Sequence, residues 1–585
     1  LVPSIPPVDK GEMIEALTEQ ETAAFVKSYT AEGAKVEYRV AQIADLQRLV
    51  EQFAQAALRA RQAGFDGVEI HAGHGYILSE FLSPHVNCRQ DEYGGSLENR
   101  ARLLQEVIRG VKLRVGSDYP VWCRIDATEL RIEGGISYAD AVATAMLAEQ
   151  AGADAIHVSA YANPASGAAF TEAPLVHQPA GYLGYAQGIK QKLSIPVIAV
   201  GRIEPEEGDA AIASGKADFV AMGRKLLADP DLPTRLRQGR PDDIRPCIYC
   251  YTCVSRIFVN DHVRCAVNPA TGFEYETVVS PAEKPRKLLV VGGGPAGMEA
   301  ARIAAQRGHQ VRLAEQARSL GGTAFFASVV YPENGRLVDY LKQQIAGSSV
   351  ELDLGVKVDE SYLDSFRPDA VIVATGARRD APNIPGVDQD NVFSGDEMRG
   401  LMTGHGAESA RSKLAFWQRW ALSLAGSLGI TRNAALLARL SHVWMPLGKQ
   451  VCIVGGGLVG AELAEFLALR GRKVSLIEES GKFAVELPLV RRWRLLEELK
   501  QLSVVMINHT RLLRVSGRQL AIDCQGSEVE IEADTVILAS GACGDLSLAE
   551  RAREMGYETH VAGDCDGVGY LEGAMRSAHQ VATAL

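Results

Sequence analysis

The chain carries one glycine-rich pattern twice, 163 residues apart. Apolar residues run directly into closely spaced glycines at residues 287–297, and again at residues 451–460. In each copy an acidic residue, Glu315 or Glu478, lies 23 residues after the first glycine. A single glycine pattern precedes many helices, but a repeat with an apolar strand before it and a carboxylate after it is typical of dinucleotide-binding modules. The sequence therefore predicts two such modules.

The glycines indicate where each dinucleotide would bind. Glycine lets backbone N–H groups at a helix N-terminus approach a pyrophosphate, and the distant carboxylate accepts hydrogen bonds from ribose hydroxyls. We interpret the first copy as an FAD site and the second as an NADH site. The residues expected to bind are Gly292, Gly294, Gly297 and Glu315 in the first copy, and Gly455, Gly457, Gly460 and Glu478 in the second.

Two further segments support this order, Ala-Thr-Gly at 374–376 and Ala-Gly-Asp at 562–564. In flavin enzymes with two dinucleotides, such an Asp commonly meets the ribityl chain of FAD. We therefore expect Asp564 to bind FAD, with the FAD module split around the NADH module; an Asx turn at Asp564 is the alternative. Glu478 would repel a 2′-phosphate and so favours NADH over NADPH. NADPH is the alternative cofactor, because the basic residues Arg472 and Lys473 precede the strand that ends at Glu478.

Four cysteines precede the first glycine copy, at Cys247, Cys250, Cys253 and Cys265. Three close thiolates and one distant thiolate can hold a [4Fe–4S] cluster. A structural zinc site is an alternative, although zinc usually takes two CxxC pairs or one CxxC with two histidines, and only His262 lies nearby. Unligated cysteines are the third interpretation. Clustered thiols also require a reducing compartment, which indicates the cytoplasm.

Ahead of the cysteines, short apolar runs alternate with amphipathic helical stretches. The expected strands are residues 67–71, 121–127, 155–160, 195–202 and 219–224. Repeated strand and helix units predict an α/β fold with a parallel sheet, which we interpret as part of a (β/α)₈ TIM barrel. Only five of eight units can be counted, so we expect the first three strands to lie outside this chain.

Polar residues follow these strands at the edge where barrel enzymes carry their chemistry. His71, His74 and Tyr76 follow the first strand. Two imidazoles can bind a substrate carbonyl and stabilise an enolate, and a phenol can donate a proton. One histidine at a strand end is usually structural, but three such residues close together favour catalysis.

The later strand ends predict an FMN site. Arg124 could neutralise the reduced flavin ring, although a salt bridge to Asp126 or Glu129 is the alternative. The loops after the last two strands form the usual phosphate site of barrel enzymes. The residues expected there are Gly201, Arg202, Gly223 and Arg224.

Charge and length exclude several classes of partner and predict several domains. A net charge of −11 provides no broad cationic surface for nucleic acid or anionic lipid, and we find neither an apolar run of 18 residues nor a leader.

Residues 399–447 are rich in Trp and Leu and predict a helical insert that packs on the nucleotide modules; a membrane- or partner-binding segment is the alternative. The expected order is a barrel (1–245), a cysteine segment with linker (246–284), the first segment of the FAD module (285–398), the insert (399–447), an NAD(P)H module (448–542) and the second segment of the FAD module (543–585).

Together these motifs resemble the multidomain NADH:flavin oxidoreductases, the group of 2,4-dienoyl-CoA reductase and trimethylamine dehydrogenase, with a barrel like that of old yellow enzyme. The resemblance is carried by residues 71–76, 81–87, 93–100 and 195–202, the four cysteines and both glycine copies. It implies FMN in the barrel, a [4Fe–4S] cluster, and FAD and NAD(P)H modules. It also implies that His71 and His74 face substrate or flavin and that Tyr76 donates a proton.

Two departures keep the substrate class open. The interval between Cys250 and Cys253 resembles trimethylamine dehydrogenase, whereas the intact second glycine copy does not. We expect an NADH-dependent ene reductase, with electrons passing from NADH through FAD, the cluster and FMN to the C=C bond of an enoyl-CoA, a dienoyl-CoA or an enone. The alternatives are an amine dehydrogenase or demethylase, and a truncated, non-catalytic flavin-binding scaffold for electron transfer. The expected partner is a small-molecule substrate, and a homo-oligomer is compatible with the sequence.

Overall fold

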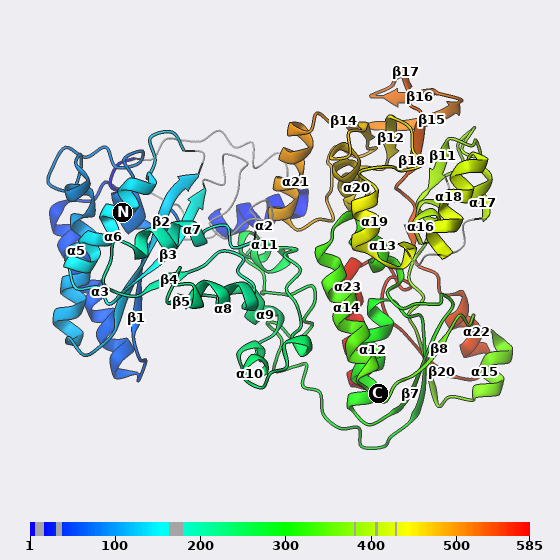
Figure 1. Ribbon diagram of the computed structural model, residues 1–585, viewed down its shortest axis with the longest axis horizontal. Helices are drawn as coiled ribbons and strands as arrows, with labels where there is room; N and C mark the ends of the chain where they lie inside the picture. The colour runs from blue at the N-terminus through cyan, green and yellow to red at the C-terminus, as the bar shows by residue number, and fades with distance from the viewer. Residues whose placement is uncertain are drawn as a thin grey trace. The chain divides into compact units, whose positions relative to one another are not determined.

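A computed structural model describes residues 1–5, 17–30, 38–130, 132–162, 179–379, 382–403, 408–427 and 430–585. The chain divides into two compact units, Leu1–Gly223 and Arg224–Leu585. Figure 1 shows the helices and strands, most of them labelled. In the part of the chain that the structure describes, we find no helix with the length and apolar character needed to cross a membrane.

The first unit is built on one five-stranded parallel sheet in the order β1-β2-β3-β4-β5. Its strands are β1 (Val68–Ala72), β2 (Val121–Leu130), β3 (Ala155–Ala162), β4 (Val197–Ala199) and β5 (Phe219–Val220). Its helices are α2 (Glu19–Thr30), α3 (Ile43–Gln62), α4 (Ile77–Leu82), α5 (Leu97–Val115), α6 (Tyr138–Gln150), α7 (Leu183–Lys190) and α8 (Pro205–Ala213). The predicted alternation of strands and helices in a parallel sheet is confirmed.

The last two strands are shorter than the sequence predicts. Strand β4 ends at Ala199 and β5 at Val220, whereas the predicted strands end at residues 202 and 224. The chain leaves the sheet after β4 because Gly201 and Arg202 both have positive φ, 120° and 55°. A positive φ is incompatible with an extended strand, and Arg202 adopts it at some conformational cost. Both predicted glycine–arginine pairs therefore lie after the ends of their strands.

The core of the first unit fixes the strand ends in place. Alternate residues of β2 point into the core, where Cys123, Ile125 and Ala127 are buried. Helix α5 begins at a Ser96 cap, whose Oγ accepts a hydrogen bond from the Asn99 N–H at 3.3 Å, and it buries one side against the same core. A strand packed into such a core leaves little freedom for the residues at its end.

The second unit contains two parallel sheets of five strands each. The first has the order β20-β9-β6-β7-β8 and consists of β6 (Lys287–Val291), β7 (Gln310–Glu315), β8 (Glu351–Leu354), β9 (Ala370–Val373) and β20 (Glu558–Val561). Its helices include α12 (Pro295–Gln306), α13 (Gly322–Val330), α14 (Glu333–Ala346), α15 (Glu360–Phe366), α22 (Ser547–Glu554) and α23 (Tyr570–Ala584). Strand β20 pairs with β9 although the two are far apart in sequence, so this module is discontinuous.

The second sheet has the order β11-β18-β12-β13-β14. It consists of β11 (Val392–Ser394), β12 (Gln450–Val454), β13 (Lys473–Ile477), β14 (Val505–Ile507) and β18 (Thr535–Leu538), with helices α20 (Leu458–Ala468) and α21 (Leu489–Gln501). An antiparallel sheet of β15 (Thr510–Ser516), β16 (Gln519–Cys524) and β17 (Ser527–Glu532) is attached to it (Figure 1). The strand pair β10 (Arg378–Arg379) and β19 (Ala542–Cys543) is also antiparallel. Both five-stranded sheets have the strand–turn–helix arrangement of a dinucleotide-binding module.

Helices occupy the segment that the Trp and Leu content marks as an insert. They are α16 (Gly395–Thr403), α17 (Glu408–Ser412), α18 (Phe416–Ser427) and α19 (Ala434–Leu440), while residues 404–407 and 428–429 lie outside the described residues. Trp417 and Trp444 contact each other with ring centroids 5.6 Å apart, yet Trp420 is 64% exposed. The segment that follows the first unit and leads through the first three cysteines contains α9 (Arg224–Ala228), α10 (Leu232–Arg237) and α11 (Thr252–Phe258).

Candidate functional site

In the first unit, strand register brings three polar residues together. His71 on β1 pairs with Arg124 on β2, and Arg124 pairs with His157 on β3. Residues that are paired across neighbouring parallel strands point to the same face of the sheet. His157 is held in turn by Glu69, whose Oε2 lies 2.7 Å from His157 Nδ1. No sequence pattern indicates His157, because its position beside Arg124 follows from strand register alone.

The predicted His71, His74 and Tyr76 cluster is present. The His71 and His74 rings are 4.9 Å apart in an edge-to-face arrangement, and the His71 and Tyr76 rings are 5.1 Å apart. The Tyr76 side chain is exposed. The three side chains thus lie side by side, with a phenol that a ligand can reach.

Two buried residues that carry no functional motif, Asp126 and Ser159, orient His74. The His74 N–H donates to Asp126 Oδ2 at 2.6 Å, and His74 Nε2 lies 2.8 Å from Ser159 Oγ. Burial, together with the nearby Arg124 charge, lowers the pKa of His74 to about 3. Burial also raises the pKa of Asp126 to about 7. His74 is therefore a neutral imidazole at neutral pH, with its ring orientation fixed by Ser159.

This face of the sheet has polar atoms that suit a bound flavin. Among the described residues, His71 Nδ1 and Arg124 Nε are buried and have no hydrogen-bond partner. Buried polar atoms without partners are costly unless a ligand or water satisfies them. A Cβ atom built on Gly223 would have no neighbour within 4 Å, so the backbone there is open to approach. These features fit the expected FMN.

The structure places Arg224 beside the cysteines. Its guanidinium carbon lies 4.6 Å from the ring centroid of Tyr251 and 5.5 Å from that of Tyr249. Burial lowers the pKa of Arg224, but Tyr251 and the thiol of Cys247 raise it by more, so that the net shift is upward. Arg224 thus belongs to the second unit, whereas Gly201, Arg202 and Gly223 belong to the first.

The four predicted cysteine ligands lie close enough to influence one another's ionisation. Burial raises the pKa of Cys253, and the thiols of Cys250, Cys247 and Cys265 raise it further. Burial likewise raises the pKa of Cys265 to about 12, with Cys250 and Cys247 contributing. Burial and mutual repulsion therefore favour the protonated thiols, and a bound metal would favour the thiolates instead.

The cysteine loop has further features of a cluster site. The Tyr249 N–H donates to Cys247 Sγ at 3.5 Å, and hydrogen bonds to the sulfurs are one of the means by which a protein tunes an iron–sulfur cluster. Within the described ranges, no group of three or more His, Cys, Asp or Glu residues is arranged to hold a single metal ion. The assignment of these four cysteines to a [4Fe–4S] cluster therefore stays a prediction.

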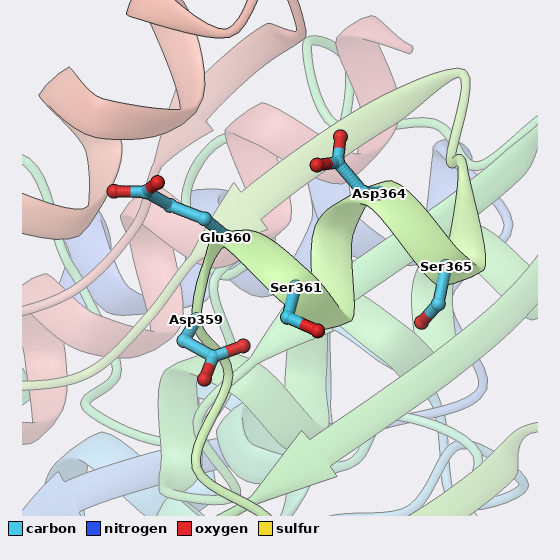
Figure 2. Close-up of a pocket in the computed structure, with 5 residues that line it drawn as sticks. All are labelled: Asp359, Glu360, Ser361, Asp364 and Ser365. Atoms are coloured by element: carbon cyan, nitrogen blue, oxygen red, sulfur yellow. The ribbon is translucent and has the colours of Figure 1, made fainter.

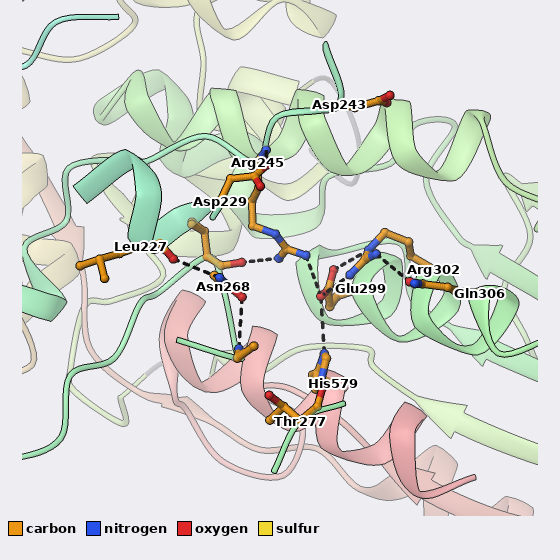
Figure 3. A network of polar contacts seen from close by, with 12 residues as sticks. Leu227, Asp229, Asp243, Arg245, Asn268, Thr277, Glu299, Arg302, Gln306 and His579 are labelled. Carbon is orange, nitrogen blue, oxygen red and sulfur yellow. Dashed lines mark hydrogen bonds and ion pairs between the residues drawn. The ribbon is translucent and has the colours of Figure 1, made fainter. Parts of the chain in front are cut away.

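A buried ion network attaches the cysteine loop to the first nucleotide module (Figure 3). The Arg245 guanidinium donates to the Glu299 carboxylate of α12 at 3.2 Å and also to the Val267 carbonyl, close to Cys265 in the loop. Arg302 donates to the same carboxylate at 2.8 Å and 3.0 Å, and His579 of α23 lies 4.0 Å from it. The two ends of the cysteine loop, near residues 245 and 267, are therefore held against α12.

The first glycine copy forms the turn between β6 and α12. A Cβ atom on Gly297 would lie 1.8 Å from the Gly292 carbonyl oxygen, so only glycine permits the close approach of the helix to the strand. A Cβ atom on Gly294 would meet nothing within 4 Å. The Glu315 carboxylate accepts hydrogen bonds from the N–H groups of Gly293 at 2.6 Å and Ala317 at 2.7 Å. The turn is thus open at the helix N-terminus, as an FAD pyrophosphate requires.

The second copy repeats this geometry between β12 and α20. A Cβ atom on Gly460 would lie 1.9 Å from the Gly455 carbonyl oxygen. The Glu478 carboxylate accepts hydrogen bonds from the N–H groups of Gly456 at 2.6 Å and Ser480 at 2.8 Å. A carboxylate has about four acceptor positions, so Glu315 and Glu478 keep capacity for ribose hydroxyls.

Asp564 and Tyr570 lie close to each other at the start of α23. Asp564 Oδ1 accepts a hydrogen bond from the Gly569 N–H at 2.9 Å, just before α23. Burial raises the pKa of Tyr570 to about 12, and the charges of Glu486 and Asp564 contribute. Tyr570 therefore lies within electrostatic range of both a residue of the second module and the predicted FAD ligand, a position that no sequence motif indicates.

A surface hollow on α15 is separate from these residues. It is lined by Asp359, Glu360, Ser361, Asp364 and Ser365 (Figure 2). Its acidic lining would repel the phosphates of a nucleotide, and it contains none of the predicted site residues.

Two family models match separate segments of the chain. Residues 10–243 match the profile of the NADH:flavin oxidoreductase / NADH oxidase family, and residues 286–566 match that of pyridine nucleotide-disulphide oxidoreductases. An NADH oxidase of Thermoanaerobacter brockii is 35% identical over 92% of this chain and 78% of its own length. A cinnamate reductase of Clostridium sporogenes is 32% identical over 92% of this chain and 77% of its length.

A solved structure extends the similarity to the fold. A 2-naphthoyl-CoA reductase in complex with 2-naphthoyl-CoA has a TM-score of 0.82 and 28% identity, covering 94% of this chain and 77% of that one. Amine dehydrogenases are also among the similar proteins. The predicted fold class, a TIM-barrel type region followed by FAD- and NAD-binding modules, is thereby confirmed.

Proposed function

The chain belongs to the multidomain NADH:flavin oxidoreductase family, and we propose that it reduces the activated C=C bond of an enoyl- or dienoyl-thioester or an enone. The observation that carries the proposal is the cluster of His71, His74 and Tyr76 beside Arg124. The names of two similar proteins support it, since cinnamate and 2-naphthoyl-CoA both have C=C bonds conjugated to a carboxyl-derived carbonyl. The intact second glycine copy supports NADH as the reductant.

The chain's own residues would hold each cofactor. We assign FMN to Arg124, Gly201, Arg202 and Gly223, and a [4Fe–4S] cluster to the four cysteines. FAD is assigned to the first glycine copy with Asp564, and NADH to the second. When bound, the flavins and the cluster supply the electron-transfer chemistry. Arg224, which stacks on Tyr251, is assigned to the surroundings of the cysteines rather than to the FMN phosphate.

His71 and His74 would bind the substrate carbonyl. A hydrogen bond from a neutral imidazole stabilises the negative charge that develops on that oxygen as hydride reaches the β-carbon. Ser159 and Asp126 keep the His74 ring and backbone in place for this role. Tyr76 then donates its phenolic proton to the α-carbon, which completes the addition of one hydride and one proton, and solvent reprotonates the exposed phenol.

Replacing Tyr76 with Phe tests this assignment. Because the hydroxyl is the proposed proton donor, NADH-dependent reduction of cinnamate or an enone should slow by about 10² or more. NADH oxidation by an artificial acceptor should stay unchanged, since it needs no proton on carbon. The control is Tyr275→Phe, which removes a hydroxyl from a side chain that is 93% exposed and belongs to the second unit.

An anaerobic substrate panel separates the proposal from its rival, an amine dehydrogenase. Bleaching of the flavin absorbance by NADH, followed by recovery with cinnamate, an enone or a dienoyl-CoA, supports the reductase. Bleaching by a methylated amine but not by NADH would show that electrons leave the first unit instead. Full activity of Tyr76→Phe on every C=C substrate would show that the Tyr76 phenol is not the proton donor.

A further inference from the structure

Glu486 lies at the N-terminus of α20, where the second glycine copy should receive a pyrophosphate. The Leu458 N–H donates to Glu486 Oε2 at 2.8 Å. A Cβ atom built on Gly457 would lie 3.0 Å from Glu486 Oε1 and 3.1 Å from Oε2. The carboxylate therefore covers the stretch of backbone that a glycine motif normally leaves open for phosphate oxygens.

The first copy has no such cover. Its helix α12 begins with Pro295, which has no N–H to donate, and a Cβ atom on Gly294 would have no neighbour within 4 Å. In the described part of the chain, no side chain accepts a hydrogen bond from the N–H of Ala296 or Gly297. The two turns thus differ at the helix N-terminus: the second has a carboxylate that accepts the Leu458 N–H, and the first has Pro295, which offers no N–H there.

A buried arginine fixes the loop that carries Glu486. Arg492 is 1% exposed and donates to the carbonyl oxygens of Ala484 at 3.1 Å, Val485 at 3.0 Å and Leu487 at 2.9 Å. The Ala484 N–H donates to the Gly456 carbonyl at 2.7 Å, which attaches the loop to the glycine turn itself. The Glu486 side chain is exposed, so rotation of this side chain alone would open the site.

We propose that Glu486 competes with the pyrophosphate of NADH for the N-terminus of α20. A carboxylate and a pyrophosphate bind the same N–H groups and repel each other, so NADH binds only in molecules where Glu486 has swung away. The apparent dissociation constant is then raised by the reciprocal of that open fraction. The substrate nucleotide exchanges readily, while FAD, at the uncovered turn, stays bound. This inference rests on the proposed assignment of NADH to the second glycine copy.

Equilibrium titration with NAD+ tests the competition without turnover. The protein is the full chain with its cofactors, and the variants are Glu486→Gln, which keeps the shape without the charge, and Glu486→Ala, which also removes the acceptor. We expect both to bind NAD+ about three- to tenfold more tightly than the wild type, and inorganic pyrophosphate to compete more strongly in both. Glu497→Gln is the control, because that carboxylate bonds only to Gln501 on α21 among the contacts the structure gives it and should leave the affinity unchanged.

Each outcome of the titration points to one conclusion. Unchanged or weaker binding of NAD+ by Glu486→Gln overturns the competition, and weaker binding would make Glu486 a ligand of the nucleotide instead. If a thermal melt shows that Glu486→Ala is unfolded, the NAD+ affinity of the isosteric Glu486→Gln variant still tests the competition. A wild type that binds no NAD+ at all contradicts the proposed function rather than this inference, so the two failures are distinguishable.

Discussion

Replacing Glu299 with Ala removes the carboxylate at the centre of the buried ion network of Figure 3. The side chain is fully buried, and its two oxygens accept hydrogen bonds from Arg245 at 3.2 Å and from Arg302 at 2.8 Å and 3.0 Å. Without it, two guanidinium groups remain in the interior with no carboxylate. Breaking a buried pair in this way costs about 3–5 kcal/mol, because an uncompensated charge stays behind.

The sign of the pH dependence follows from the same contacts. Burial raises the pKa of Glu299, but the charges of Arg245 and Arg302 outweigh burial and hold the pKa well below its usual range. The folded pKa is therefore below the unfolded value of about 4.3, so the network's contribution is fully present at neutral pH and is lost as pH falls below about 4. The stability of Glu299→Ala should consequently depend less on pH in that acidic range than the stability of the wild type.

Hydrogen–deuterium exchange measures this effect where it occurs. A chain of several modules does not unfold in one step, so the opening free energy is best read from the amides of α12 and α23. A loss of about 3–5 kcal/mol speeds their exchange by about 10² to 10³·⁷ at neutral pH, at about 1.36 kcal/mol per factor of ten. Glu530→Ala is the matched control, since its carboxylate is 61% exposed and pairs with Arg514 on the antiparallel sheet, where a surface pair contributes about 0–1 kcal/mol. A change below tenfold in α12 would refute the argument that the network holds the cysteine loop against this module.

Two further predictions concern the cofactors. Gly297→Ala should fail to fold or to retain FAD, because its Cβ would lie 1.8 Å from the Gly292 carbonyl oxygen, whereas Gly294→Ala, with open space around its Cβ, should fold normally and lose affinity for FAD. Thermal melts and flavin release on gel filtration distinguish the Gly297→Ala and Gly294→Ala variants, and equal stability and flavin retention would show that the two glycines have the same role. After anaerobic purification, Cys250→Ser should contain little iron or acid-labile sulfide. It should also lose C=C reduction, while NADH oxidation by an artificial acceptor continues. Cys524→Ser on β16 is the control with unchanged iron, and a Cys250→Ser protein with full iron content would exclude the cluster.

The glycine modules could be predicted because their signal is local. An apolar strand, a glycine turn and a helix are contiguous in sequence, and the close approach of Gly297 to Gly292 is the physical reason for the pattern. The alternation in the first unit is equally local, although Gly201 and Arg202 end β4 earlier than the apolar run suggests.

The surroundings of the predicted residues could not be found in this way. Ser159 reaches His74 only because β2 and β3 pair in one particular register. Glu486 reaches α20 only because Arg492 fixes a loop that has no pattern of its own. Such contacts depend on tertiary packing, which a periodic sequence pattern does not encode.

The split first sheet of the second unit has a consequence for synthesis on the ribosome. Strand β20 pairs with β9, yet residues 374–557, which include the whole second sheet, are translated between them. The inner module can complete its own sheet as soon as it emerges, whereas the outer module keeps the edge of β9 unpaired until β20 follows. A pause in translation within that interval would expose the nascent chain to mispairing at this edge.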